Sequence, residues 1–188
     1  MLEVDPGTTL TIEAVTHHAG DAPDLLMDDG ITAIWSAIPE SARGPGVHIM
    51  TGPIHVRGAS PGDTLRVEIL AMRPRLPYGS NCAANWGLLY DQFGKERITI
   101  YALDDALDNG PRGEFGDTAR PLFGFDFRTL ALYDVPGVVT PPDPSAREPF
   151  GRAVRVPVRP HLGVIGVAPN EGRVSSIPPG VFGGNVDN

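Results

Sequence analysis

The stretch Asp63–Met72, "DTLRVEILAM", has the clearest strand pattern in the chain. Its aliphatic residues Leu65, Val67 and Ile69 alternate with charged ones. Because successive side chains of a strand point to opposite faces, this alternation predicts a strand with one apolar face and one polar face. The preceding "ASPGD", residues 59–63, is typical of a tight turn, since Pro and Gly supply the geometry that a turn requires. A turn followed by an alternating strand indicates a β fold.

Further strands are predicted on both sides of this one, where β-branched and alternating residues recur. These strands are Thr9–Thr16, Val47–Met50, Ile54–Arg57, Arg97–Leu103, Leu130–Tyr133, Ala153–Val158 and Gly163–Ala168. Short helices are predicted near Pro23–Met27 and Ala33–Ala42. Because no segment has a sustained helical period, we expect a mostly β fold, arranged as a barrel or sandwich with few short helices.

Two long regions, Arg73–Lys95 and Asp104–Phe127, are rich in Gly, Asn and Asp, and we expect both to leave the sheet as loops. Long ordered loops on a rigid β scaffold often carry function. In the first region, Asn81, Asn85 and Trp86 combine amide groups with an aromatic ring, as pockets for small polar ligands do. The alternative is that the Asn residues only shape turns.

The composition excludes several classes of protein. The chain has 188 residues, a net charge of −8 and one Cys. An acidic surface without clustered Lys and Arg disfavours nucleic acids and anionic membranes, and one Cys excludes an internal disulfide framework. No stretch resembles a signal peptide or has the length of a membrane span. We therefore expect a cytoplasmic protein that binds neither nucleic acid nor membrane.

Five histidines are candidates for acid–base or metal chemistry, and a structural role is the alternative for each. His17 and His18 come at the end of the first predicted strand, directly after Thr16. In a strand, neighbours point to opposite faces and cannot easily share a metal, so surface or loop roles are expected for both. His48 follows the two glycines of "RGPG", which allow a ligand to approach the backbone closely. The chain has no zinc-type or calcium-type spacing, so a metal site would need residues from distant segments.

Cys82 is the only thiol in the chain. A lone cysteine is more often an inert buried side chain than a nucleophile, and no local motif would activate this one. The sequence also lacks the G-x-S-x-G elbow of serine hydrolases and the phosphate loop of nucleotide-binding proteins. We therefore expect Cys82 to be structural.

Two stretches resemble the acetamidase/formamidase family. The first is "RGPGVHIMTGPIHVRGASPGDTLRVEIL", residues 43–70, and the second is "HLGVIGVAPNEGRVSSIPPGVFGGNVDN", residues 161–188. They contain the family's T-G-P…G-A-x-P-G-D turn, a P-P-G turn and a Gly-Gly-Asn-x-Asp cluster. The resemblance implies a β-rich fold with swivelling β/β/α elements.

The same resemblance implies a hydrolase that cleaves the C–N bond of short linear amides, of the formamide or acetamide type, to a carboxylic acid and ammonia. It also implies a homo-oligomer. Family members continue beyond the Gly-Gly-Asn-x-Asp cluster. Residues 1–188 are therefore expected to form a single β-rich domain that corresponds to the N-terminal portion of a family member, with the C-terminal half missing here. The alternatives are a non-catalytic β-rich module for ligand binding or assembly, and a hydrolase of another C–N bond.

The Gly-Gly-Asn-x-Asp cluster supplies the first candidates for the chemistry. Asp187 is expected to be a general base or a metal ligand, and Asn185 to donate to the oxyanion or to orient the water. The backbone N–H groups of Gly183 and Gly184 would assist substrate binding. The alternative for Asn185 and Asp187 is an Asx turn that closes the last strand.

His48 is the third catalytic candidate, as an acid or a base. With Asp187 it is also the expected ligand pair for a divalent metal, zinc or calcium. The loop residues Asn81, Asn85 and Trp86 are expected to bind the amide substrate.

Overall fold

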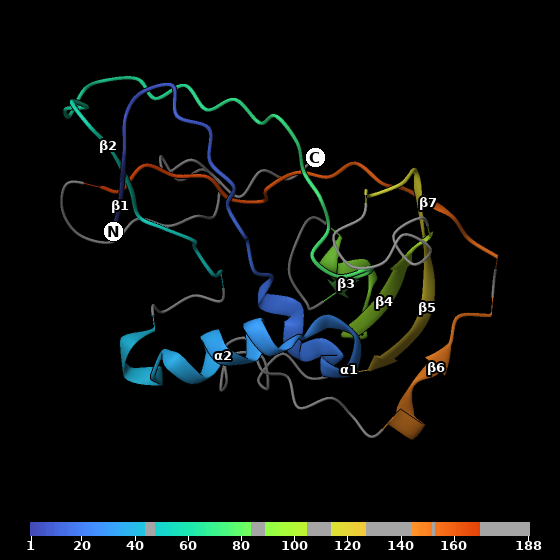
Figure 1. Cartoon of the computed structure of the whole chain (residues 1–188). Helices are drawn as coiled ribbons and strands as arrows, with labels where there is room; N and C mark the ends of the chain where they lie inside the picture. The colour runs from blue at the N-terminus through green and yellow to red at the C-terminus, as the bar shows by residue number, and fades with distance from the viewer. Residues whose placement is uncertain (44–47, 84–88, 105–113, 127–143, 152, 170–188) are drawn as a thin grey trace. The chain divides into compact units, whose positions relative to one another are not determined.

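The computed structural model describes residues 1–43, 48–83, 89–104, 114–126, 144–151 and 153–169 (Figure 1). They belong to two compact units. Of the described residues, unit 1 contains 1–14, 50–71 and 160–169, and unit 2 contains those between 15 and 49 and between 72 and 159. The expectation of one β-rich domain with a missing C-terminal half stays a prediction.

The described part of unit 2 is built on a five-stranded sheet (Figure 1). The strands are β3 (Tyr78–Ala83), β4 (Arg97–Leu103), β5 (Thr118–Asp126), β6 (Glu148–Pro149) and β7 (Val156–Pro157). β4 lies between β3 and β5, and both pairings are antiparallel. On β4, Ile98, Ile100 and Ala102 are fully buried and alternate with partly buried residues, so one face of the strand lies in the core.

One short helix, α1 (Pro23–Leu26), packs on the buried face of this sheet. The helical elements are η1 (His17–Asp21), α1 (Pro23–Leu26), α2 (Asp29–Ala37), η2 (Glu40–Ala42), η3 (Tyr90–Gln92) and η4 (Pro144–Ala146). The core joins Ala22 and Leu26, at and in α1, to Ile98, Ile100 and Phe125 of the sheet. Apolar burial between α1 and the sheet therefore holds η1, which directly precedes α1, close to β3.

β3 and β5 lie in the two regions that the sequence pattern predicted as loops, and those predictions are wrong. Gly, Ser, Asn and Pro weaken the strand signal in both segments. β5 accepts Pro121 because the register shifts there. Ile100 pairs with Phe123 whereas Tyr101 pairs with Pro121, so that Leu122 is the extra residue of a bulge. A bulge is one of the few places in a sheet that tolerate proline.

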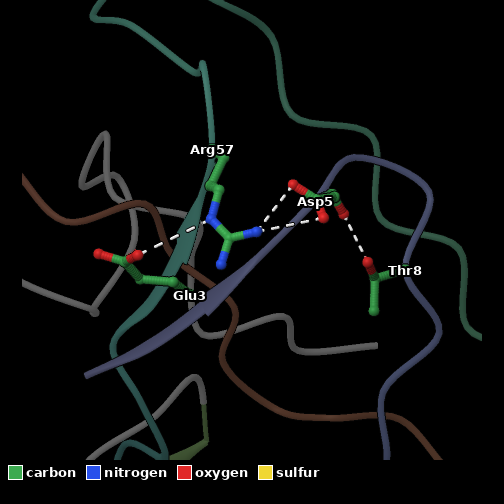
Figure 2. A network of polar contacts seen from close by, with 4 residues as sticks. All are labelled: Glu3, Asp5, Thr8 and Arg57. Atoms are coloured by element: carbon green, nitrogen blue, oxygen red, sulfur yellow. Dashed lines mark hydrogen bonds and ion pairs between the residues drawn. The ribbon is translucent and has the colours of Figure 1, made fainter.

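The described part of unit 1 contains a parallel pair, β1 (Leu2–Val4) and β2 (Ile54–Val56). Figure 2 shows the polar contacts beside it. Arg57 Nη1 donates to the two carboxylate oxygens of Asp5 at 3.1 and 3.2 Å, and Arg57 Nε lies 3.8 Å from Glu3 Oε2. Since these side chains are exposed, the ion pairs add little to stability, and backbone pairing fixes the two strands.

The strand predicted for Asp63–Met72 is not formed. Leu65, Val67 and Ile69 alternate as expected, but they are 51%, 54% and 50% exposed. The alternation specifies which side chains share a face, whereas a strand also needs a hydrogen-bonded neighbour. In the described residues this stretch has no strand pairing.

Two other predicted strands also differ from the structure. Thr9–Thr16 forms no strand, and Gly163–Ala168 contains only one paired residue, Val164. Of the predicted Val47–Met50, the described residues 48–50 form no strand. Leu130–Tyr133 and Val47 lie outside the described residues.

Several other expectations are confirmed. β2, β4 and β7 lie within predicted strands, α1 lies within the predicted first helix, and Ser60 and Asp63 close the expected turn with bonds of 2.8 and 3.0 Å. α2 begins at Asp29, earlier than predicted, because the Asp28 side chain caps it. A mostly β fold with few short helices is thus confirmed for the described chain. Within that part, none of the helices has the length and apolar character of a membrane span.

Candidate functional site

A group of polar side chains lies where η1 meets β3 in unit 2. We call it the histidine cluster and define it by His17, His18, Asp21, His48 and Ser80. The ring centroid of His17 lies 4.0 Å from that of His18 and 5.2 Å from that of His48. Three imidazoles therefore adjoin one another, although their residues come from two segments of the chain.

The two adjacent histidines meet because they lie in a helical turn and not in extended backbone. The Thr16 side chain caps η1 by accepting from the His18 backbone N–H at 3.1 Å. In a strand, neighbouring side chains would point to opposite faces, but in a turn with three residues per repeat they are about a third of a turn apart. The rings of His17 and His18 can therefore lie against each other, with 39° between their planes.

Asp21 fixes the position of His18. The carboxylate is 1% exposed, and its Oδ2 lies 2.8 Å from His18 Nδ1. Residues three apart in this helical form lie above one another, which brings the two side chains together. Ser80 Oγ from β3 also donates to Asp21 Oδ2, in a short hydrogen bond. The other carboxylate oxygen, Oδ1, is buried and has no hydrogen-bond partner among the described residues.

His17 is held in its neutral form. Burial, together with the charges of His18 and His48, lowers the pKa of His17 to about 3. A neutral imidazole at physiological pH packs as an aromatic ring. His17 therefore contributes apolar and ring contacts to the histidine cluster rather than a charge.

Cys82 lies on the same face of β3 as Ser80 and packs against the core of Ala22, Leu26 and Phe125. Burial raises the pKa of the Cys82 thiol to about 12, with further contributions from Asp21 and Glu96. The thiolate is the reactive form of cysteine, so this thiol is inert at neutral pH. The expectation that Cys82 is structural agrees with this environment.

The opposite face of β3 carries Asn81. It lines an open cavity of ≈ 400 Å³ together with Gln92, Phe93, Lys95 and Arg97. Arg97 at this cavity is already paired with Asp126 and Glu148 at 2.9 and 2.8 Å. Because neighbouring strand residues point to opposite sides, β3 places Asn81 away from Ser80 and the histidine cluster.

Of the candidate residues, the structure therefore places His48 in the histidine cluster and Asn81 at the cavity. The others lie outside the described residues: Asn85, Trp86, Gly183, Gly184, Asn185 and Asp187. Sequence reasoning gave His17 and His18 surface or loop roles and did not single out Asp21 or Ser80. The spacing His18-x-x-Asp21 was the available signal, because it aligns two side chains in a helical turn.

The described residues include no group of three or more His, Cys, Asp or Glu side chains that could hold a metal ion. Of the two expected ligands, His48 lies in the histidine cluster and Asp187 lies outside the described residues.

The fold and the histidine cluster define a β-rich protein with a hydrogen-bonded His–Asp pair beside its sheet. The family model of the Acetamidase/Formamidase family matches residues 2–177. The chain therefore belongs to the acetamidase/formamidase family. The match includes the whole histidine cluster and ends before Gly183. Comparison with curated proteins and with solved structures gave no match.

Proposed function

We propose that this protein hydrolyses short linear amides of the formamide or acetamide type to a carboxylic acid and ammonia. The observation that carries the proposal is the family match over residues 2–177. Amide hydrolysis needs an activated water, donors for the oxyanion and a proton for the departing ammonia. The histidine cluster offers imidazoles and a buried carboxylate, which are groups of the required kind.

The Gly-Gly-Asn-x-Asp residues belong to the same proposal. Asp187 would act as a base or as a ligand of zinc or calcium, and Asn185 would donate to the oxyanion. Cytoplasmic location and a homo-oligomeric state are also proposed. Elemental analysis of the purified protein tests the metal, and analytical ultracentrifugation tests the oligomer.

The function is tested by ammonia release from formamide and acetamide, compared with a larger amide and a carbamate. We expect the two small amides to be cleaved fastest. A protein that releases no ammonia from any of them is not this hydrolase, and ligand binding or assembly would then be the better reading. Release from the carbamate alone would assign a different C–N bond.

The role of Asp187 has a separate test. Asp187→Asn is expected to lower kcat/KM by about 100-fold or more, as the loss of a general base does. Asp91→Asn, at an exposed carboxylate in η3, is the matched control and is expected to retain activity. If Asp187→Asn retains kcat/KM within a few fold, Asp187 is neither the base nor an essential ligand.

A further inference from the structure

We propose that His18 and Asp21 form a catalytic pair, with His18 as the general base of amide hydrolysis and Asp21 as its positioning residue, so that Asp187 keeps the other of its two proposed roles, that of a metal ligand. The proposal rests on the proposed function and adds residues to which no role has been given. His18 would touch the reacting water, whereas Asp21 would act through His18.

The first argument is the direction of the hydrogen bond. His18 Nδ1 lies 2.8 Å from Asp21 Oδ2. Because an ionised carboxylate can only accept a hydrogen bond, this contact places the proton of a neutral imidazole on Nδ1. The other ring nitrogen, Nε2, then carries the lone pair and can accept a proton. A carboxylate that holds an imidazole in this tautomer is the arrangement by which enzymes orient a histidine base.

The second argument is that the Asp21 side chain is more deeply buried than the His18 side chain. The Asp21 side chain is 1% exposed, whereas that of His18 is 23% exposed. The carboxylate thus lies inside and the imidazole lies at the surface, where a water and an amide can reach it. Ser80 holds the carboxylate from β3, so the pair is anchored to the sheet as well as to η1.

The third argument distinguishes His18 from its neighbour. His17 is a poor base, since burial keeps its pKa at about 3. Its ring instead lies against that of His18, with 4.0 Å between the centroids and 39° between the planes. This contact restricts the rotation of the His18 ring.

The reaction balances with these groups alone. His18 Nε2 takes a proton from water while the water oxygen bonds to the amide carbon. The C–N bond then breaks, and the proton on Nε2 passes to the leaving nitrogen, which departs as ammonia. One amide and one water give one carboxylic acid and one ammonia, and His18 returns to its neutral form.

The tautomer of His18 is the readout that does not depend on activity. Nitrogen-15 NMR of the whole protein is expected to show His18 protonated on Nδ1 and bare on Nε2. Asp21→Asn is expected to remove this preference. A wild-type protein in which neutral His18 is protonated on Nε2 would overturn the pair, because Nδ1 would then not donate to Asp21.

The kinetic test uses His18→Ala in the full chain, with formamide and acetamide. We expect kcat to fall by about 100-fold or more, with KM changed by less than about threefold. Added imidazole is expected to restore part of the lost rate, since it can enter the space left by the ring. The matched control His55→Ala, at an exposed position of β2, is expected to keep its kcat and to show no response to imidazole.

The outcomes separate the two proposals. If the wild type is active and His18→Ala keeps its kcat, the role of His18 is overturned and the proposed function stands. If His18→Ala loses activity but imidazole restores none of it, the role of His18 is only structural and the catalytic pair is again overturned. A wild type that releases no ammonia overturns the proposed function, and the pair with it.

Discussion

Asp28 caps helix α2 and pairs with Arg75 through one carboxylate. Asp28 Oδ1 accepts from the Ile31 backbone N–H at 2.8 Å, while Arg75 Nε donates to Oδ2 at 2.7 Å and Arg75 Nη2 donates to Oδ1 at 3.1 Å. Gly30 leaves room for this arrangement, since a Cβ there would collide with the guanidinium. The carboxylate therefore joins the start of α2 to the chain just before β3.

Removing this carboxylate is expected to destabilise unit 2. Asp28→Ala is expected to lower the free energy of unfolding by about 1–2 kcal/mol, because α2 loses its cap and the hydrogen bonds from Arg75 to this carboxylate are lost. Urea denaturation measures the change. Asp29→Ala is the control, since it removes the same charge from the exposed neighbouring position, and a loss as large as that of Asp28→Ala would contradict the assignment.

The pair of Asp28 and Arg75 also predicts that the stability of the protein decreases in acid. The Arg75 hydrogen bonds hold the pKa of Asp28 below its usual value of 3.8. In acid, the Asp28 carboxylate therefore binds a proton less readily in the folded protein than in the unfolded chain. The stabilisation that Asp28 contributes above pH 3.8 is lost as the pH falls through the pKa of the folded protein. Asp28→Asn can still cap α2, so the stability difference from wild type is expected to shrink below that pH. A difference that stays constant down to pH 2 would exclude this linkage.

Arg147 is expected to tolerate lysine poorly. Its Nη1 and Nη2 donate to the two oxygens of Asp24 at 2.8 and 2.6 Å, and its guanidinium lies 4.6 Å from the centroid of the Phe123 ring. Lysine cannot form the planar fork, so Arg147→Lys is expected to cost about 1–2 kcal/mol of unfolding free energy. Arg66→Lys, at a side chain that is 87% exposed, is the control. Equal and small effects at both positions would show that the fork contributes nothing.

His17 predicts a second pH dependence with the same sign. Unfolded His17 gains a proton near its usual pKa of 6.5, whereas folded His17 does so only near 3. Between these values the unfolded chain binds the extra proton, so stability is expected to fall with falling pH by up to about 1.4 kcal/mol per unit. Denaturation curves between pH 6.5 and 4.5 test this against His17→Gln. If the substitution leaves the slope unchanged, His17 is not the group that titrates.

Cys82 is expected to resist modification in the folded protein. Because burial raises its thiol pKa to about 12, an alkylating reagent at pH 8 should label it slowly in buffer and quickly in denaturant. Mass spectrometry measures the labelled fraction. Cys82→Ala is expected to keep the rate of ammonia release. Rapid labelling of the native protein, or loss of activity in this variant, would contradict a structural role and support a nucleophilic role for Cys82.

The sequence predicted those parts of the fold whose signal is local. β4 has the bounds that its β-branched alternation predicted, and the Ser60–Asp63 turn forms where its Pro and Gly indicated. By contrast, β3 is held by its neighbour β4 and by the core contacts of Tyr78 and Cys82, which its own residues do not reveal. Asp63–Met72 is the converse case, in which a strong local pattern lacks the pairing that would make it a strand.

The candidate site was less predictable for a related reason. Asp21 and Ser80 lie 59 residues apart, and only the docking of η1 onto β3 brings them together. His48 was singled out for its glycine-rich flank, whereas the structure groups it with His17 through ring contact. A single sequence shows the residue types of such a site, but the tertiary contacts decide which of them meet.

The alternation along β3 means that this strand can evolve as two independent surfaces. Substitutions at Asn81 or Ala83 alter the cavity face and leave the Asp21 partner Ser80 in place, whereas changes at Ser80 or Cys82 alter the other face alone. An inserted or deleted residue within the strand would exchange the two sets at once. Natural variation in β3 should therefore consist of replacements, while changes of length are confined to the segments that flank it.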